Sequence, residues 1–504
     1  MACSGSSYSE DNDDRESLLP SGVTDPLVNA RTTEKIDQKR HAGLVSTALL
    51  LINRMIGAAI FSIPSSIVRS VGSTGGILSL WLVGFALAYC GMFVWLELGC
   101  RMPHSGGEKL YLEQAYPRLA RLTTTLYAFY VLFSFGGLTC VVVADNLLLA
   151  LNVSAGDAGK RTLSMGVLVL IAVLHISSRT WSMRIMNSLG LIKIVILVLV
   201  ILTGVAAVCG LLPSVPDPGR SFQHPFAGSS TDAYAYTVAL FKILATFNGW
   251  HNAAYVLDEV KDPQRTLKLS GILGVGAVGV PYLLANVCYV FVATPEEISH
   301  AGVQVVAILL GKVFGSGIRQ TTAALTALSS FASLMTIAFA FSRVVQRLAW
   351  EGAIPAGQYI CQANILWNTL YRVLPHVLFY SGSHQYSTFW YVLPFPYLMC
   401  MLTGVGDAYI FLVDLSQYEV AMIGFFVAIG LFRLRRKSLV TRHQFRVWTV
   451  VPYIFLTCQL YLLLSPSLAP EEGGTNTSLP YWLAPVTALS ALGLGILYWW
   501  LRRR

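Results

Sequence analysis

Two long apolar stretches of this chain are interrupted near their centres by residues that a helix in lipid tolerates poorly. The first stretch covers residues 44–70 and contains Gly57 and Pro64, and the second covers 236–260 and contains Asn248-Gly249-Trp250-His251-Asn252. A membrane-crossing helix has to satisfy its own backbone hydrogen bonds, so a break at mid-depth is costly unless it lines a cavity. Paired breaks of this kind are typical of the binding site of a secondary transporter.

The number of apolar stretches predicts an all-α membrane protein. Hydrophobic residues make up 55% of the 504 positions and charged residues only 12%, about half the charged share of soluble domains. Runs of about 20 apolar residues, each long enough to cross a bilayer, occur about twelve times. The expected spans are 44–70, 74–100, 122–151, 162–178, 186–212, 235–260, 268–294, 318–350, 386–406, 408–433, 446–466 and 480–501. Because spans one and six are the broken ones, we predict two inverted repeats of five helices followed by two C-terminal helices.

The first 40 residues differ from the rest of the chain. Residues 1–40 are polar, rich in Ser, Asp and Glu and poor in aromatic residues, which predicts a disordered tail ahead of one transmembrane domain over 41–504. The net charge of +9 does not call for a nucleic acid partner, because the positive residues gather in alternate loops as the positive-inside rule describes. Their distribution predicts that both termini are cytosolic.

The two breaks carry the groups that an amino-acid-like substrate needs. A carboxylate requires free N–H groups, which a helix that starts after a break supplies together with a partial positive charge. An ammonium group requires free carbonyl oxygens, which we place near 55–57 and 246–248. The predicted substrate-binding residues are Ile56, Gly57, Ala58, Ala59, Ile60, Phe61, Thr246, Phe247, Asn248 and Gly249. The alternative is a simple glycine kink where two helices cross.

Lys193 lies a little inside one end of the fifth span. A lysine within a membrane span is expensive and is a functional candidate by default. We predict that Lys193 exchanges a proton or takes the place of a bound cation, with Ser329, Ser330 and Ser333 of the eighth span as further coupling residues. The alternatives are that Lys193 extends to the lipid headgroups and that the serines bond to their own helix.

Four motifs, in order along the chain, resemble those of the amino acid–polyamine–organocation superfamily. Met55-Ile56-Gly57-Ala58-Ala59-Ile60-Phe61 resembles its GxGIF signature, and Ser105-Gly106-Gly107-Glu108-Lys109 resembles its SGG motif. The stretches 248–263 and 342–355 are similar to the ends of its sixth and eighth helices. Together with 406–409 and 478–482, these motifs resemble the fungal methionine permeases of the L-type branch. The resemblance covers residues 43–356 and 404–504.

This resemblance implies a LeuT-like fold and proton-coupled uptake of methionine or another large neutral amino acid by alternating access at the plasma membrane. By the same resemblance, the backbone of 57–61 takes the carboxylate, and Lys193 matches the lysine that occupies the family's sodium position. The loop 152–161 lacks the cysteine that would link a heavy chain, so no disulfide-linked partner is expected. The expected partners are therefore the amino acid, the coupling proton and the lipid bilayer.

Departures from the family pattern leave a second function open. The family usually has Ser or Thr and then Gly where this chain has Ala58 and Ala59, which makes close approach of a carboxylate harder. Residues 357–385 do not resemble the usual loop and ninth helix. A nutrient-sensing or non-transporting homologue is the alternative, and substrate binding without flux would identify it.

Two further expectations concern chemistry and location. We expect no enzymatic activity, metal or cofactor, because the chain has no GxSxG motif, phosphate loop or Cys/His spacing typical of such sites. The stretch Asp14-Arg15-Glu16-Ser17-Leu18-Leu19 resembles an acidic dileucine sorting signal. It makes a vacuolar or endosomal membrane the alternative location.

Overall fold

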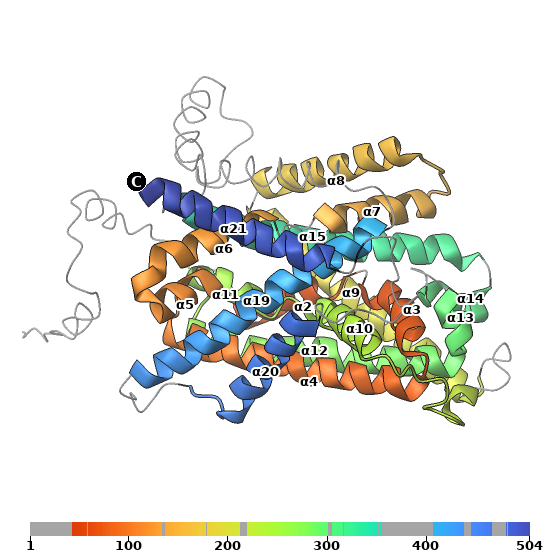
Figure 1. Cartoon of the computed structure of the whole chain (residues 1–504). Helices are drawn as coiled ribbons and strands as arrows, with labels where there is room; N and C mark the ends of the chain where they lie inside the picture. The colour runs from red at the N-terminus through yellow and green to blue at the C-terminus, as the bar shows by residue number, and fades with distance from the viewer. Residues whose placement is uncertain are drawn as a thin grey trace, which may run out of the picture. The chain divides into compact units, whose positions relative to one another are not determined.

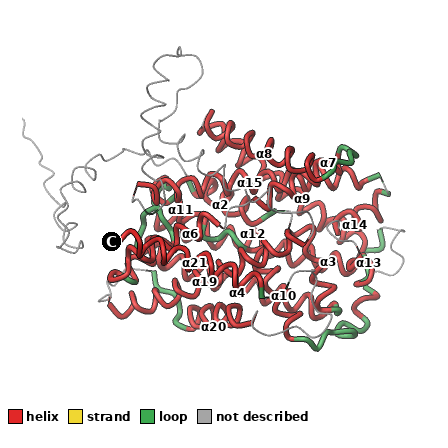
Figure 2. The backbone as a smooth tube through the Cα atoms, turned by 45° about the horizontal axis from the view of Figure 1, so that its top comes forward, coloured by secondary structure: helices red, strands yellow, loops and turns green. Residues whose placement is uncertain are grey.

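The computed structural model describes residues 43–57, 59–133, 137–177, 179–211, 219–300, 305–315, 317–350, 353, 407–437, 445–465, 480 and 482–503. The regular elements of these residues are all helical (Figures 1 and 2). The predictions for the tail 1–40, the ninth span 386–406 and the segment 357–385 lie outside the described residues.

Apart from the ninth span, each predicted span contains at least one described helix, which confirms the all-α membrane fold. Seven of them are long and apolar enough to cross a membrane by length and composition, and shorter apolar helices accompany them. The seven are α4 (Thr74–Arg101), α8 (Asp157–Ser177), α9 (Arg179–Val208), α12 (Pro263–Val292), α15 (Ile318–Trp350), α19 (Asp407–Lys437) and α21 (Leu483–Arg503). The shorter helices at predicted spans are α2 (Leu44–Met55), α3 (Ala59–Val71), α6 (Ala120–Phe133), α7 (Gly137–Ala150), α10 (Ala233–Phe247), α11 (Asn252–Tyr255) and α20 (Val450–Leu464).

Both predicted breaks are present. Helix α2 ends at Met55, and Ile56 turns into an extended conformation (φ −76°, ψ 99°) before α3 begins. Helix α10 ends at Phe247, Asn248 is also extended (φ −64°, ψ 124°), and only the four-residue α11 and the 3-10 turn η3 (Leu257–Glu259) follow. Gly249 has a φ of +146°, which a residue with a side chain rarely adopts. The prediction that helices 1 and 6 are broken is therefore confirmed.

Three described helices were not predicted. They are α5 (Glu108–Ala115), α13 (Pro295–His300) and α14 (Val305–Phe314), and two 3-10 turns also lie in loops, η1 (Pro117–Leu119) and η2 (Arg220–Phe222). Each of these elements is much shorter than the run of about 20 apolar residues that identifies a span. A search for spans therefore passes over them.

Helix α2 lies inside the bundle, where it contacts α9, α12 and α15 (Figure 1). Small residues allow this close packing, because glycines let helix backbones approach each other in lipid. A Cβ atom built on Gly274 of α12 would lie 3.2 Å from the Cβ of Leu51 on α2. The packing brings the C-terminal end of α2 against the middle of α9 and α15.

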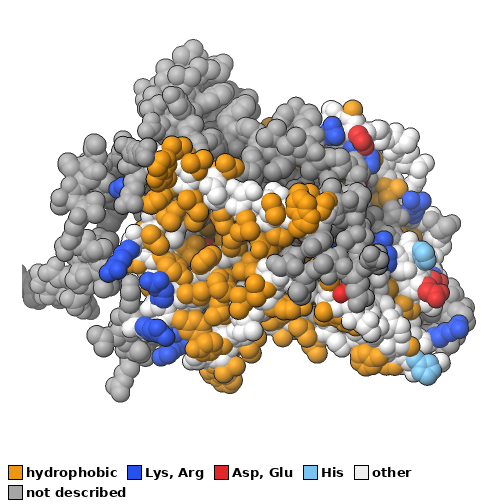
Figure 3. Space-filling view, viewed as in Figure 1, with side chains coloured by type: hydrophobic (Ala, Val, Ile, Leu, Met, Phe, Trp, Pro, Cys, Tyr) orange, Lys and Arg blue, Asp and Glu red, His pale blue; other side chains and the backbone are white. Residues whose placement is uncertain are grey.

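Apolar side chains cover much of the described surface on the face seen in Figure 3. Leu202 of α9, Leu273 of α12 and Leu497 of α21 are each at least half exposed. In this view lysine and arginine side chains lie at both ends of the bundle, and aspartate or glutamate side chains accompany them at the end away from α5 (Figures 1 and 3). A large exposed apolar surface of this kind fits contact with lipid.

Candidate functional site

The Lys193 ammonium group lies beside the break in helix 1. The residue is 1% exposed, and its Nζ is 2.8 Å from the Asn53 carbonyl oxygen, 2.5 Å from the Ile56 carbonyl oxygen and 2.7 Å from Ser333 Oγ. An ammonium group has three N–H donors and no acceptor. Each donor therefore has its own partner, and Lys193 is fully satisfied in its charged form.

Ser333 completes this arrangement. Its Oγ is 3.0 Å from the Asn53 carbonyl oxygen and 2.9 Å from that of Ile56, so its hydroxyl donates to one of the two. The last carbonyls of a helix have no partner within the helix and carry the negative end of its dipole. Lys193 and Ser333 thus bind the C-terminal end of α2 to α9 and α15, as a bound cation would.

The other two predicted coupling serines do not contact Lys193. Ser330 Oγ donates to the Thr326 carbonyl oxygen of its own helix at 2.8 Å. The buried Ser329 Oγ has no hydrogen-bond partner among the described residues. The structure therefore brings only Ser333 of the three to the lysine, and Lys193 itself points into the bundle instead of towards lipid headgroups.

Asn53 was not identified from the sequence, yet it shapes this site. It is fully buried, and its Nδ2 donates to the Met186 carbonyl oxygen on α9. A Cβ atom on Gly190 would lie 2.8 Å from the same Nδ2, so glycine at that position allows α9 to approach α2. The sequence signal that could have identified Asn53 is an uncharged amide side chain within an apolar span.

The predicted substrate-binding residues lie at the two breaks. Buried among them are Ile56, Ile60, Phe61, Thr246, Phe247, Asn248 and Gly249, whereas Gly57 and Ala59 are partly exposed and Ala58 is outside the described residues. The breaks touch each other, because a Cβ atom on Gly249 would lie 2.6 Å from Cγ of Arg54, next to the end of α2.

Protein groups already occupy two carbonyls of the first break. The Met55 carbonyl oxygen accepts a hydrogen bond from the Tyr282 hydroxyl at 2.9 Å, and the Ile56 carbonyl oxygen accepts from Lys193. Tyr282, on α12, is another residue that the sequence did not single out. The carbonyls near 55–57 were predicted to receive an amine. Those of Met55 and Ile56 already accept hydrogen bonds from the protein itself.

Phe247 packs among aromatic side chains of α4 and α12. Its ring is fully buried and lies 5.9 Å from Trp81 and Phe85 of α4 and 5.4 Å from Tyr282 of α12. Thr246 Oγ1 donates to the Ile243 carbonyl oxygen of its own helix at 2.6 Å. At the second break, the side chains of these two residues are thus engaged, whereas Asn248 Oδ1 has no hydrogen-bond partner among the described residues.

The SGG stretch contacts the C-terminal end of the broken sixth helix, which consists of α10, α11 and η3. The Asp258 N–H donates to Ser105 Oγ at 2.8 Å, and the Ser105 N–H donates to Asp258 Oδ2 at 3.2 Å. These reciprocal bonds fasten the loop before α5 to the turn η3. The loop therefore closes the bundle at the end where α5 lies.

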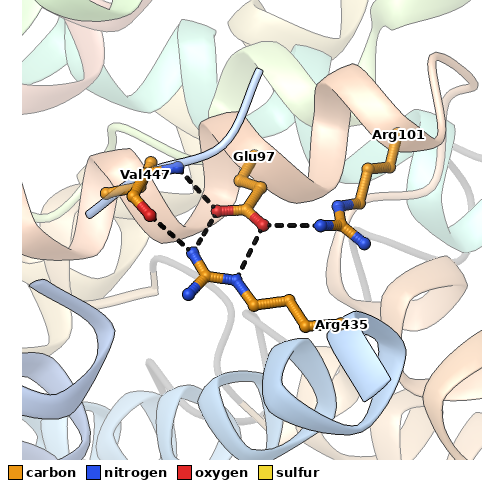
Figure 4. A network of polar contacts seen from close by, with 4 residues as sticks. All are labelled: Glu97, Arg101, Arg435 and Val447. Carbon is orange, nitrogen blue, oxygen red and sulfur yellow. Dashed lines mark hydrogen bonds and ion pairs between the residues drawn. The ribbon is translucent and has the colours of Figure 1, made fainter. Parts of the chain in front are cut away.

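A second hydrogen-bond network at this end is centred on the fully buried Glu97 of α4 (Figure 4). Arg101 Nη2 donates to its Oε1 at 2.8 Å, and Arg435 of α19 donates to Oε1 from Nε at 2.9 Å and to Oε2 from Nη2 at 2.5 Å. The Val447 N–H donates to Oε2 at 2.9 Å. The carboxylate thus ties α4 to α19 and to the segment before α20.

A family model of amino acid permeases matches residues 43–490 of the chain. The chain belongs to the amino acid permease family. It is similar to the high-affinity methionine permease of Saccharomyces cerevisiae, with 26% identity over 490 residues that cover 95% of this chain and 82% of the permease. The predicted superfamily is thereby confirmed.

Two human proteins of the L-type group are also similar to this permease. The large neutral amino acids transporter small subunit 2 is 25% identical over 73% of this chain and 69% of its own length. The cystine/glutamate transporter is 24% identical over 88% and 83%. Membership in the amino acid permease family supports amino acid transport by a membrane protein with many spans. Among the described residues, no group of three or more His, Cys, Asp or Glu could hold a metal ion.

Proposed function

We propose that this permease is a secondary active transporter that takes up methionine or another large neutral amino acid together with a proton, by alternating access. The contact of Lys193 with the end of α2 carries this proposal. It places the lysine amine in contact with two helices that an alternating-access mechanism would have to separate. The similarity to two yeast methionine permeases supports the substrate class.

The substrate would lie between the two breaks. The first N–H groups of α3, at Ala59 to Phe61, precede its helical hydrogen bonds and lie at the positive end of its dipole, so they suit a carboxylate. The last carbonyls of α10, at Thr246 and Phe247, are free of helical partners by the same rule and suit the amine. Since the Met55 and Ile56 carbonyls are engaged, we assign the amine to helix 6.

Lys193 would act at the coupling site, with Ser333 as its partner. As an ammonium group it holds the end of α2 against α15, and its loss would free that end. The remaining predicted coupling residues, Ser329 and Ser330, would act less directly, because they make no contact with the lysine.

We place the permease in the plasma membrane with both termini in the cytosol. The basic residues at the C-terminal ends of α4 and α19 support this orientation by the positive-inside rule. The α5 end would then face the cytosol. We expect no disulfide-linked heavy chain, because the loop 152–161 contains no cysteine.

The test is uptake of labelled methionine into proteoliposomes, with and without an inward proton gradient. Wild-type protein should accumulate methionine when the gradient is present. Lys193→Ala and Lys193→Met should lose this accumulation, whereas Lys160→Ala should keep it, because Lys160 makes only a partly exposed ion pair with Asp145. Binding of amino acids without any flux would reject transport and favour the nutrient-sensing alternative.

A further inference from the structure

Glu108 is a buried carboxylate whose hydrogen bonds come from uncharged donors. It is 3% exposed. Trp95 Nε1 donates to its Oε1 at 2.9 Å, and the Tyr127 hydroxyl donates to its Oε2 at 3.1 Å. Two other acidic residues of this region have basic partners, since Glu97 is bound by two arginines and Glu113 lies 3.0 Å from Lys109. Glu108 is therefore the carboxyl group of this region best suited to bind a proton.

The surroundings of Glu108 come from the parts that close the α5 end. Trp95 belongs to α4 and Tyr127 to α6, and Tyr255 of α11 covers the start of α5. A Cβ atom on Gly107, which has a φ of +52°, would lie 2.6 Å from ring atoms of Tyr255. Movement of the end of helix 6 would break the Ser105–Asp258 contact and expose Glu108 to water.

The cluster accommodates both protonation states of Glu108. A tyrosine hydroxyl both donates and accepts, so Tyr127 can donate to the carboxylate or accept from the protonated carboxyl group. Burial raises the pKa of Glu108, and hydrogen bonds that include those from Trp95, Tyr255 and Tyr127 oppose this only in part. Among the described residues, the titratable groups that interact electrostatically with it are Tyr111 of α5, Tyr127 of α6 and Tyr255 of α11.

We propose that Glu108 is a proton-binding site of the permease, protonated while the α5 end is closed and ionised when that end opens. The proposal rests on the proposed function and extends it. A proton from the outer side would bind the Glu108 carboxylate, and the O–H bond would break when cytosolic water reaches the carboxyl group. By linkage, a proton that binds the closed form more tightly than the open form favours closure. Lys193 then holds the end of α2, and Glu108 carries the proton.

The first test separates exchange from proton-driven accumulation. An inward gradient of about one pH unit can sustain about tenfold accumulation when one proton moves with each substrate. Glu108→Gln keeps the shape and hydrogen-bonding capacity of the protonated group. We expect it to exchange labelled for unlabelled methionine as wild type does, but to lose the gradient-driven accumulation. The matched control is Glu113→Gln in the same helix, which should retain both activities.

The second test does not depend on transport. Infrared difference spectra of the purified permease between about pH 5 and about pH 8 should show the carbonyl stretch of a protonated carboxyl group. This band should be absent from Glu108→Gln and present in Glu113→Gln. Identical spectra for wild type and Glu108→Gln would overturn the proposal, as would an unchanged gradient response in that variant. If wild type moves no amino acid, the proposed function fails, and the spectra alone decide whether Glu108 binds a proton.

Discussion

Replacing Arg435 by methionine should destabilise the permease strongly, because it leaves Glu97 in the protein interior with one cation in place of two. The substitution removes two hydrogen bonds to the carboxylate, at 2.9 and 2.5 Å, and one to the Val447 carbonyl oxygen at 2.9 Å. Methionine keeps most of the aliphatic length of arginine, so the loss of packing is small. The perturbation is therefore mainly electrostatic.

The size of the effect follows from burial. Glu97 has an exposed side-chain fraction of 0% and Arg435 of 6%, and breaking such a pair by removing one partner costs about 3–5 kcal/mol. Arg101 remains 2.8 Å from the carboxylate, so we expect the lower part of the range, about 3 kcal/mol. Lys160→Met breaks an ion pair whose side chains are 27% and 35% exposed, and it should cost below about 1 kcal/mol.

Unfolding of both variants in detergent micelles, followed by circular dichroism against denaturant concentration, gives the two free-energy differences. A double variant, Arg435→Met with Glu97→Gln, should be less destabilised than the sum of its single variants, because the two residues contact each other. Equal stability losses for Arg435→Met and Lys160→Met would refute the reasoning, since burial would then not decide the strength of the pair.

Three further outcomes are expected. Ser333→Ala should weaken proton-driven methionine uptake more than Ser330→Ala, because only Ser333 contacts Lys193; equal uptake by both variants would contradict this. Gly107→Ala should lower thermal stability by about 1 kcal/mol or more, because its φ is positive and the new Cβ would meet a tyrosine ring; a wild-type melting curve would argue against that contact. The stability of wild type relative to Glu108→Gln should fall as pH rises through the raised pKa of Glu108. A carboxyl group whose pKa is raised in the folded state stabilises the fold while it is protonated, and this contribution is lost as the pH rises through that pKa. Parallel pH profiles of the two proteins' melting temperatures would show that this group does not titrate.

The broken helices were predictable because their signal is local. Gly57, Asn248 and Gly249 interrupt apolar stretches, and a helix in lipid responds to such residues wherever it lies. Helix α5 escaped prediction for the converse reason. It has eight residues of mixed composition, and its burial depends on the contacts it makes with α6 and α19.

The candidate site was predictable in its residues but not in its contacts. Lys193 attracts notice because a charge in an apolar span needs a partner. Its partners, the Asn53 and Ile56 carbonyl oxygens, lie 140 and 137 positions earlier in the chain. No sequence pattern indicates which of the three serines of the eighth span would face it, because that depends on the rotation of α15 against α2.

The amino acid sequence by itself determined the spans, the two breaks and the presence of a charge in the membrane, because hydropathy and backbone demands act along a single helix. Only the tertiary structure decided that Arg435, 338 positions from Glu97, would share its carboxylate. It also decided that Glu108 would be enclosed by tryptophan and tyrosine donors and not by a basic residue. Those outcomes depend on how whole helices pack, since the packing sets which distant side chains meet and which are shielded from water.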